Sequence, residues 1–274
     1  MTAPYTAPRP SHPNHTSMRY FSLLIVLALL ATACANPDAD QAADEPIVST
    51  PRPDASNPLP GNFTWPGDWQ TRFDRPSEDY VVSGDTAVAN PDIYFTNMRP
   101  GWHLTSGPAG IYWHPLSTAE GDYAVAANFF QFDPGDRNEA YGLIFGGSDL
   151  AGLDQAYLYF LVRRSGEFLI KHRQGEETHN IVDWTANEAI ASWPPANPED
   201  GTVANELAVS VDGDHLSFLV NGALVHQMPK ADWTTDGIVG FRVNHELNLH
   251  ISSFDVLQAS DVMEAAADSS AMGN

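Results

Sequence analysis

Cysteine and lysine are nearly absent from this 274-residue chain, which has one cysteine, Cys34, and two lysines, Lys171 and Lys230. A single cysteine excludes a disulfide within the chain, so a folded domain must depend on its hydrophobic core. Lysine and arginine together number 13 against 35 acidic residues, and the formal net charge is −22 at pH 7. Such a charge repels phosphate backbones, so the composition argues against nucleic acid as a partner.

Several catalytic and metal-binding motifs are missing as well. The ten histidines form neither a His-x-x-x-His nor a His-Glu-x-x-His zinc pattern. The Gly-x-Ser-x-Gly turn of serine hydrolases and phosphate-binding loops are also missing. Asp133 and Asp136, in the segment Asp-Pro-Gly-Asp, offer oxygen ligands and are weak calcium candidates. The alternative is a plain turn built from turn-forming residues, and we expect no other cofactor or metal.

A short apolar run precedes the only cysteine. Arg19 is followed by Leu23 to Leu30 and then by Ala-Thr-Ala before Cys34. The run is too short for a bilayer, which needs about 20 apolar residues, but it suits a secretory signal. It resembles the signal peptide of a bacterial lipoprotein that starts at Met18, and this resemblance implies cleavage before Cys34 and lipidation of that residue. An ordinary signal peptide with an incidental cysteine is the alternative.

Composition divides the chain into four parts. Residues 1–34 hold the signal peptide, and residues 35–61, rich in Pro, Ala and Asp, predict a disordered linker. Residues 62–258 form the domain, and residues 259–274 predict a disordered tail. We expect a lipid-anchored protein of the bacterial cell envelope, with the lipid bilayer as a partner through acylated Cys34. In a Gram-negative organism, Ala35 resembles the residue that follows the cysteine in outer-membrane lipoproteins.

The domain reads as short β-branched and aromatic runs separated by turn residues, with no convincing helical periodicity. These runs predict strands at 123–132, 140–145, 156–163, 167–173, 205–211, 215–220, 223–227, 237–244 and 247–257. Asn221-Gly222 favours a type I′ hairpin turn. Residues 186–192 are expected to form at most a short helical turn in a loop. About ten strands with tight turns indicate an all-β sandwich or barrel.

The order of these strands resembles the concanavalin A-like lectin/glucanase superfamily, and within it the laminin G-like and 3-keto-disaccharide hydrolase branches. The residues that carry the resemblance include Tyr141-Gly-Leu-Ile-Phe-Gly, the Leu207–Gly222 hairpin and Gly237-Ile-Val-Gly. It implies a two-sheet jelly-roll sandwich. Glucanases of this superfamily use a Glu-x-Asp-x-x-Glu strand that sets two carboxylates about 5 Å apart. No such strand occurs here, which argues against that activity.

Aromatic and basic side chains give the best remaining sign of a ligand site. Tyr157, Tyr159 and Arg163 share strand parity, and so do Lys171 and Arg173 on the next predicted strand. Trp102-His103 and Tyr141 complete the candidate set. We expect these residues to line a groove on the concave sheet, where rings stack on sugars and bases bond hydroxyls or carboxylates. The alternative is that the rings belong to the core and the bases balance an acidic surface.

Three functions remain open at this stage. Binding of carbohydrate, or of a glycosylated partner, follows from the candidate groove. Hydrolysis of a glycoside follows from the resemblance to the 3-keto-disaccharide hydrolase group, with no catalytic residue identified. A module that holds another envelope protein is the third, and a flat apolar surface patch would favour it.

Overall fold

The computed structural model describes residues 65–75, 77, 79–85, 91–195, 201–231 and 233–259. Cys34, the predicted signal peptide and the predicted linker therefore lie outside the described residues, as does nearly all of the predicted tail. Within the described ranges, no helix is long and apolar enough to cross a membrane.

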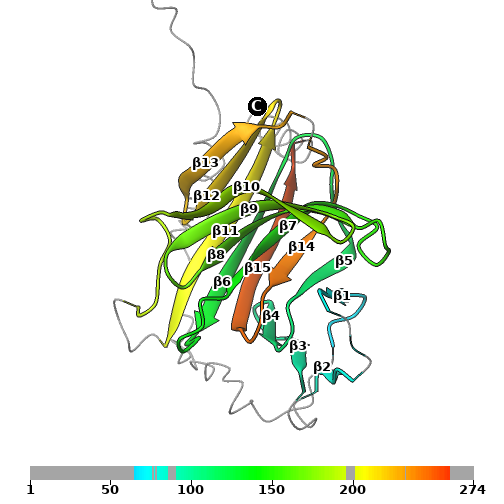
Figure 1. The fold of residues 1–274 in the computed structure, drawn as a ribbon, viewed down its shortest axis with the longest axis vertical. Helices are drawn as coiled ribbons and strands as arrows, with labels where there is room; N and C mark the ends of the chain where they lie inside the picture. The colour runs from blue at the N-terminus through cyan, green and yellow to red at the C-terminus, as the bar shows by residue number, and fades with distance from the viewer. Residues whose placement is uncertain are drawn as a thin grey trace, which may run out of the picture. The chain divides into compact units, whose positions relative to one another are not determined.

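Fifteen strands are found in these ranges, and they form two sheets (Figure 1). The first sheet has seven strands in the order β1 (Gln70–Phe73), β5 (Gly110–Ala119), β14 (Gly237–Val243), β7 (Ala140–Ser148), β8 (Ala156–Arg163), β9 (Glu167–Gln174) and β10 (Glu177–Ala186). The second has eight, in the order β13 (Ala223–Pro229), β12 (His215–Val220), β11 (Thr202–Asp212), β6 (Tyr123–Phe132), β15 (Asn248–Gln258), β4 (Trp102–Ser106), β3 (Ile93–Asn97) and β2 (Val82–Ser83). The prediction of an all-β, two-sheet jelly-roll sandwich is confirmed.

The main hydrophobic core lies between the two sheets. Alternate residues of β8, namely Leu158, Phe160 and Val162, belong to it, and so do Leu207 and Val209 of β11 in the other sheet. Their alternation along each strand is the period of two that places successive side chains on opposite faces. A strand whose two faces are both covered must be apolar at nearly every position, which explains the continuous run of β8.

Most predicted strands are found with nearly the predicted bounds. The sequence prediction missed strands before residue 120 and after residue 176. Strands β1 to β5 and β10 were not predicted. The short helical turn expected over residues 186–192 is found only as a single turn and not as a helix, with the Ile190 N–H donating to the Asn187 carbonyl at 3.2 Å. Ala186 still belongs to β10, and the Asn187 side chain accepts a hydrogen bond from the Ala189 N–H at 2.9 Å, which closes a turn. Asn and Asp side chains commonly make such turns.

The Asn221-Gly222 prediction is confirmed. Both residues have positive φ, 52° and 78°, and they join β12 to β13 with Val220 paired to Ala223. The Asn221 side chain donates hydrogen bonds to the Asn205 Oδ1 at 3.0 Å and to the Ala189 carbonyl at 2.8 Å. The turn is therefore tied to the loop that follows β10.

Candidate functional site

The predicted grouping of residues on β8 and β9 is found on the outer face of the seven-stranded sheet, which is the face turned away from the other sheet. Tyr157 is paired with Arg173, Tyr159 with Lys171, and Arg163 with Glu167 across the two strands. Tyr157 and Tyr159 belong to an apolar cluster separate from the main core. The sequence parity argument therefore placed these bases and tyrosines correctly on one face.

An apolar cluster fills this outer face beneath its basic residues. Tyr157 is 2% exposed and Tyr159 is 4% exposed. They pack in a cluster whose other buried members are Ile111, Trp113, Ala140, Ile144, Leu150, Leu161 and Leu169, with Trp184 and Ile238 partly buried against it. Leu150 comes from the loop after β7 and Trp184 from β10, so the face is covered from two sides. The two phenol rings are consequently hidden from a ligand, and only groups at the margin of the cluster are accessible.

Arg242 of β14 lies buried at one margin of this cluster, bound by Asp74. Its Nη1 donates to Asp74 Oδ1 at 3.0 Å, its Nη2 donates to Asp74 Oδ2, and the Tyr157 hydroxyl lies 3.4 Å from Nη1. The guanidinium carbon is also 5.3 Å from the centre of the Tyr159 ring. Paired, planar hydrogen bonds of this kind are the geometry in which arginine holds a carboxylate most firmly.

These contacts change the pKa values of the groups involved. Burial raises the pKa of Asp74, but hydrogen bonding to Arg242 and its positive charge outweigh burial, so the net pKa lies below the usual value. Burial raises the pKa of Tyr159 to about 12, although the charge of Arg242 opposes this. Asp74 is thus held as a carboxylate and Tyr159 as a neutral phenol at pH 7. Sequence reasoning missed this pair because β1 is short and was not predicted.

Arg163 is held at the opposite margin. Its Nε donates to Glu167 Oε2 at 2.9 Å, and its guanidinium carbon lies 4.0 Å from the centre of the Trp184 ring. Ser165 donates to the same carboxylate, and this hydrogen bond, followed by those of Arg163, lowers the pKa of Glu167. Trp184 remains partly exposed, so it is an accessible aromatic ring on this face.

The other bases of this face are less fully neutralised. Arg72 donates to the Leu150 carbonyl at 3.3 Å and to the Gly152 carbonyl, and Arg173 donates to the Gly175 carbonyl at 2.7 Å. Lys171 has no ion-pair or hydrogen-bond partner within the part of the chain that the structure describes. The bases that the strand pairings place on this face are Arg72, Arg163, Lys171, Arg173 and Arg242. Arg163 and Arg242 contact carboxylates, and the charge of Arg173 also lowers the pKa of Asp74, so Lys171 is the least compensated base of this set.

Tyr141 and Trp102 do not reach this face, contrary to the predicted groove. Tyr141 points from β7 into the main core, where its hydroxyl accepts a hydrogen bond from Asn205 at 3.1 Å and burial raises its pKa to about 12. Trp102, on β4 of the eight-stranded sheet, packs against the main core with its ring 5.1 Å from that of Trp69. Tyr141 has the opposite strand parity to the outward-facing side chains, and Trp102 lies on a strand that was not predicted.

His103 lies on the opposite side of the molecule from the basic face, on the outer surface of the eight-stranded sheet. It is 2% exposed, and its ring lies 5.8 Å from those of Tyr94 and Phe132. It is paired with His250 across β4 and β15. It is therefore separated by the whole sandwich from the bases with which the sequence had grouped it.

The weak calcium candidates form a turn. The Asp133 Oδ1 accepts a hydrogen bond from the Gly135 N–H at 2.8 Å, and Gly135 has a φ of 60°. Arg137, which follows, forms an ion pair with Glu246. Among the described residues, no group of three or more His, Cys, Asp or Glu side chains can hold a metal ion. The turn interpretation accounts for these residues.

No protein-family profile matches the chain, and no curated protein matches it in sequence. Among solved structures, it is similar to the carbohydrate-binding module CBM66 from Bacillus subtilis, with 12% identity and a TM-score of 0.48, over 73% of this chain and 99% of that one. It is also similar to a protein of unknown function with a galectin-like fold from Bacillus subtilis, with 15% identity and a TM-score of 0.46, over 70% and 89%. A Bacteroides ovatus mixed-linkage glucan GH16 protein shows 10% identity and a TM-score of 0.42, over 72% and 97%.

Proposed function

We propose that this protein binds an acidic saccharide at the margin of the outer face of the seven-stranded sheet. The observation that carries the proposal is the concentration of bases there, on a chain with a net charge of −22. Lys171 lies on β9 with no ion-pair or hydrogen-bond partner among the described residues. Arg173 lies on the same strand, and the partly exposed Trp184 lies on the neighbouring β10. A sugar that carries a carboxylate or sulfate fits a lysine, an arginine and a ring at the same surface.

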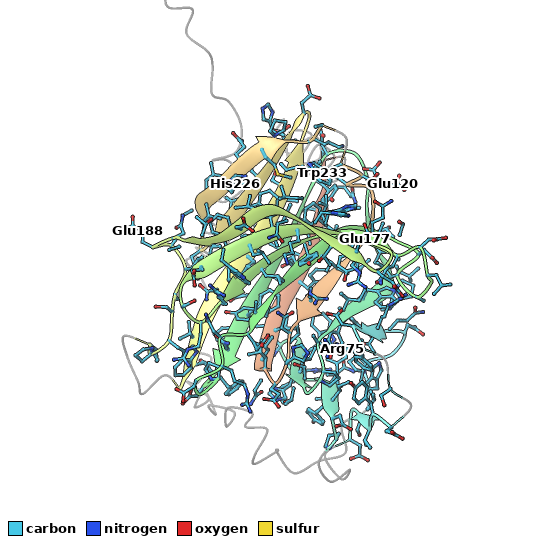
Figure 2. The ribbon with its side chains drawn as sticks, viewed as in Figure 1. Arg75, Glu120, Glu177, Glu188, His226 and Trp233 are labelled. Atoms are coloured by element: carbon cyan, nitrogen blue, oxygen red, sulfur yellow. The ribbon has the colours of Figure 1, made fainter. Side chains whose placement is uncertain are left out.

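Electrostatics favours an anionic ligand over a neutral one at this place. Positive side chains on an otherwise acidic protein attract an anionic ligand only at short range, because exposed charges are screened beyond about 8 Å at physiological salt. The long β9–β10 hairpin provides an extended surface, and Figure 2 shows Glu177 and Glu188 at opposite ends of it. The shape suits a chain molecule more than a small isolated ligand.

Binding without hydrolysis is the form of the activity that the side chains support. Both oxygens of Asp74 bond to Arg242, and its pKa is lowered, so it cannot act as a general acid at neutral pH. Glu167 is likewise kept ionised by Ser165 and Arg163. A hydrolase of the two-carboxylate type needs one carboxyl that stays protonated, and neither of these does.

The test is calorimetric titration of the full chain with a uronate oligosaccharide and with its neutral counterpart. Lys171→Ala should weaken uronate binding about tenfold or more, since a charge-assisted hydrogen bond contributes roughly 1.5 kcal/mol or more. Lys230→Ala, which removes the only other lysine, is the matched control and should leave affinity unchanged. Affinity should also fall with added salt. Equal uronate affinities in Lys171→Ala and Lys230→Ala, or a uronate affinity that does not fall with added salt, would refute this site.

The position of the protein in the cell is part of the same proposal. We infer a lipid anchor at Cys34, because an apolar run and small residues precede the only cysteine of the chain. An acylated cysteine followed by the Pro-, Ala- and Asp-rich segment 35–61 would hold the binding domain at a distance from the envelope. A binder of acidic polysaccharide in that position would attach the cell surface to such a polymer.

A further inference from the structure

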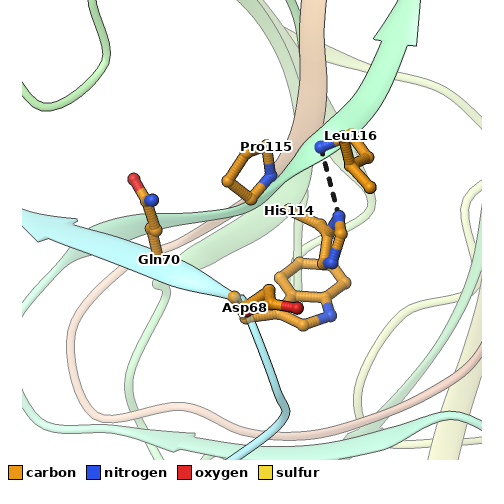
Figure 3. A pocket seen from close by; sticks show the side chains of 6 residues that line it. Asp68, Gln70, His114, Pro115 and Leu116 are labelled. Carbon is orange, nitrogen blue, oxygen red and sulfur yellow. Dashed lines mark hydrogen bonds between the residues drawn. The ribbon is translucent and has the colours of Figure 1, made fainter.

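A separate hollow lies at the edge of the seven-stranded sheet, where β1 meets the middle of β5. It has a volume of about 390 Å³ and is lined by Asp68, Trp69, Gln70, His114, Pro115 and Leu116 (Figure 3). Pockets for small ligands start at about 300 Å³. None of the five bases of the basic face lines the hollow, although Gln70 has the same strand parity on β1 as Arg72.

An irregularity in β5 creates the hollow. Trp113 of β5 is paired with Gly240 of β14, whereas Thr118 is paired with Ile238. Four residues of β5 therefore lie opposite a single residue of β14, and they bulge out of the ladder. Pro115 is one of the four, and its lack of an N–H suits a position without a ladder hydrogen bond. Bulges of this kind often redirect side chains next to functional sites.

Trp69 gives the hollow a rigid wall. Its ring is stacked on Phe241 at 5.2 Å with an interplanar angle of 16°, and it meets the rings of Phe95 and Trp102 edge-on at 5.4 and 5.1 Å. The Trp69 carbonyl accepts a hydrogen bond from Trp65 Nε1 at 3.1 Å. As a residue Trp69 is only partly buried and it lines the hollow, so a ring already fixed by its neighbours is available there.

The lining of the hollow includes both donors and acceptors of hydrogen bonds. His114 Nδ1 accepts a hydrogen bond from the Leu116 N–H at 3.2 Å, as the dashed line in Figure 3 shows. Because Nδ1 is an acceptor, the neutral imidazole carries its proton on Nε2, which is left to donate. Asp68 supplies carboxylate acceptors, and the Gln70 amide supplies both a donor and an acceptor. Pro115 and Leu116, with Leu116 83% exposed, form the apolar side.

We propose that this hollow binds one neutral sugar residue of a saccharide. Its apolar ring face would contact Trp69 and Leu116, and its hydroxyls would bond Asp68, Gln70 and His114. The hollow has a charge opposite to that of the basic face. With a neutral His114, Asp68 is the only charged side chain among the lining residues. An acidic sugar is therefore disfavoured here. The proposal does not depend on the proposed function, since the residues and the ligand charge both differ.

The experiment is calorimetric titration of the full chain with neutral gluco-, galacto-, manno- and xylo-oligosaccharides, and with a uronate oligosaccharide in parallel. At least one neutral series should bind, and Leu116→Ala should weaken it about threefold to fivefold through lost apolar contact. Asp68→Asn should weaken it about tenfold, because a hydrogen bond to a charged group is lost. Asn tolerates the φ of 62° at this position, so the backbone should be kept.

Leu153→Ala is the matched control, because Leu153 is 85% exposed but lies in the loop after β7. It should leave neutral-sugar affinity unchanged, and Lys171→Ala should do the same. The proposal is overturned if no neutral series binds at millimolar concentrations, or if Leu116→Ala and Asp68→Asn bind as tightly as the unaltered chain. Loss of neutral-sugar binding in Lys171→Ala would also overturn it, because both ligands would then share one site.

Discussion

Replacing Asp74 by Asn should destabilise the domain through Arg242. The Arg242 side chain is 10% exposed, and its guanidinium bonds to both carboxylate oxygens of Asp74, whose side chain is 31% exposed. Asn keeps the size of the side chain but removes the negative charge. Arg242 cannot give up its proton, so it would remain charged and buried without its counter-ion.

The expected cost follows from the burial of the pair. Removing one partner of a buried ion pair costs about 3–5 kcal/mol, because an uncompensated charge is left behind. Asp74 is partly exposed and water can reach it, so the lower end, about 3 kcal/mol, applies. A domain of about 200 residues loses about 2–4 °C in Tm for each kcal/mol. We therefore expect Asp74→Asn to lower the Tm by about 6–12 °C at pH 7.

The pH dependence gives a second measure of the same contact. The pKa of Asp74 in the folded protein lies below its usual value, so the unfolded chain binds the proton first as the pH falls. The carboxylate therefore contributes its full stability above the unfolded pKa, near 3.9, and loses it as the pH falls through the lower folded value. The stability difference between the unaltered chain and Asp74→Asn should shrink toward pH 3.

Urea unfolding followed by circular dichroism at pH 7 and pH 3 measures both effects. Glu246→Gln is the matched control, because it makes the same chemical change at an exposed ion pair with Arg137. It should cost about 1 kcal/mol or less. If Asp74→Asn costs no more than Glu246→Gln at pH 7, or if its effect does not diminish on acidification, the assigned role of the Asp74–Arg242 pair is wrong.

Three further predictions concern the turn, the anchor and the domain. Gly222→Val should destabilise the domain by about 1 kcal/mol or more, since φ is 78° there, and an unchanged thermal melt would contradict this. Cys34→Ser should abolish fatty-acid labelling and detergent-phase partitioning in a bacterial host; persistent labelling would argue for another anchor. A chain from Asn62 to Gln258 should be soluble, monomeric and β-rich, with cooperative unfolding that survives reducing agent because no disulfide can form. Aggregation of this shorter chain would contradict the domain boundaries.

The strands in the middle of the chain could be predicted from the sequence because their residue patterns are distinctive. The alternation of β6 and the continuous apolar run of β8 are both patterns that strand burial imposes. Turn chemistry set the ends of several hairpins, as Asn221 and Gly222 show. The shared parity of Tyr157, Tyr159 and Arg163 was enough to place them on one face.

Other features depended on contacts that no local pattern records. The tyrosines of β8 are covered by Leu150 and Trp184, which come from a loop and a strand whose positions follow only from the folded chain. Tyr141 was misplaced because a continuously apolar strand does not reveal which of its faces meets the other sheet. The bulge in β5 also leaves no mark in the sequence. Apolar Trp113 and polar His114 alternate there as they would in a regular strand.

Trp184 lies on β10, so saccharide binding at Trp184 would be coupled to the local opening of that strand. β10 is an edge strand paired only with β9, and its register shifts twice, between Asn180 and Val182 and between Val182 and Thr185. Its residues are largely exposed, so its hydrogen bonds belong to the least protected part of the sheet. Detachment of β10 would take Trp184 away from Arg163 and expose the tyrosine cluster to water. A saccharide bound across β9 and β10 would hold the strand down, and slower amide hydrogen exchange in β10 would report its presence.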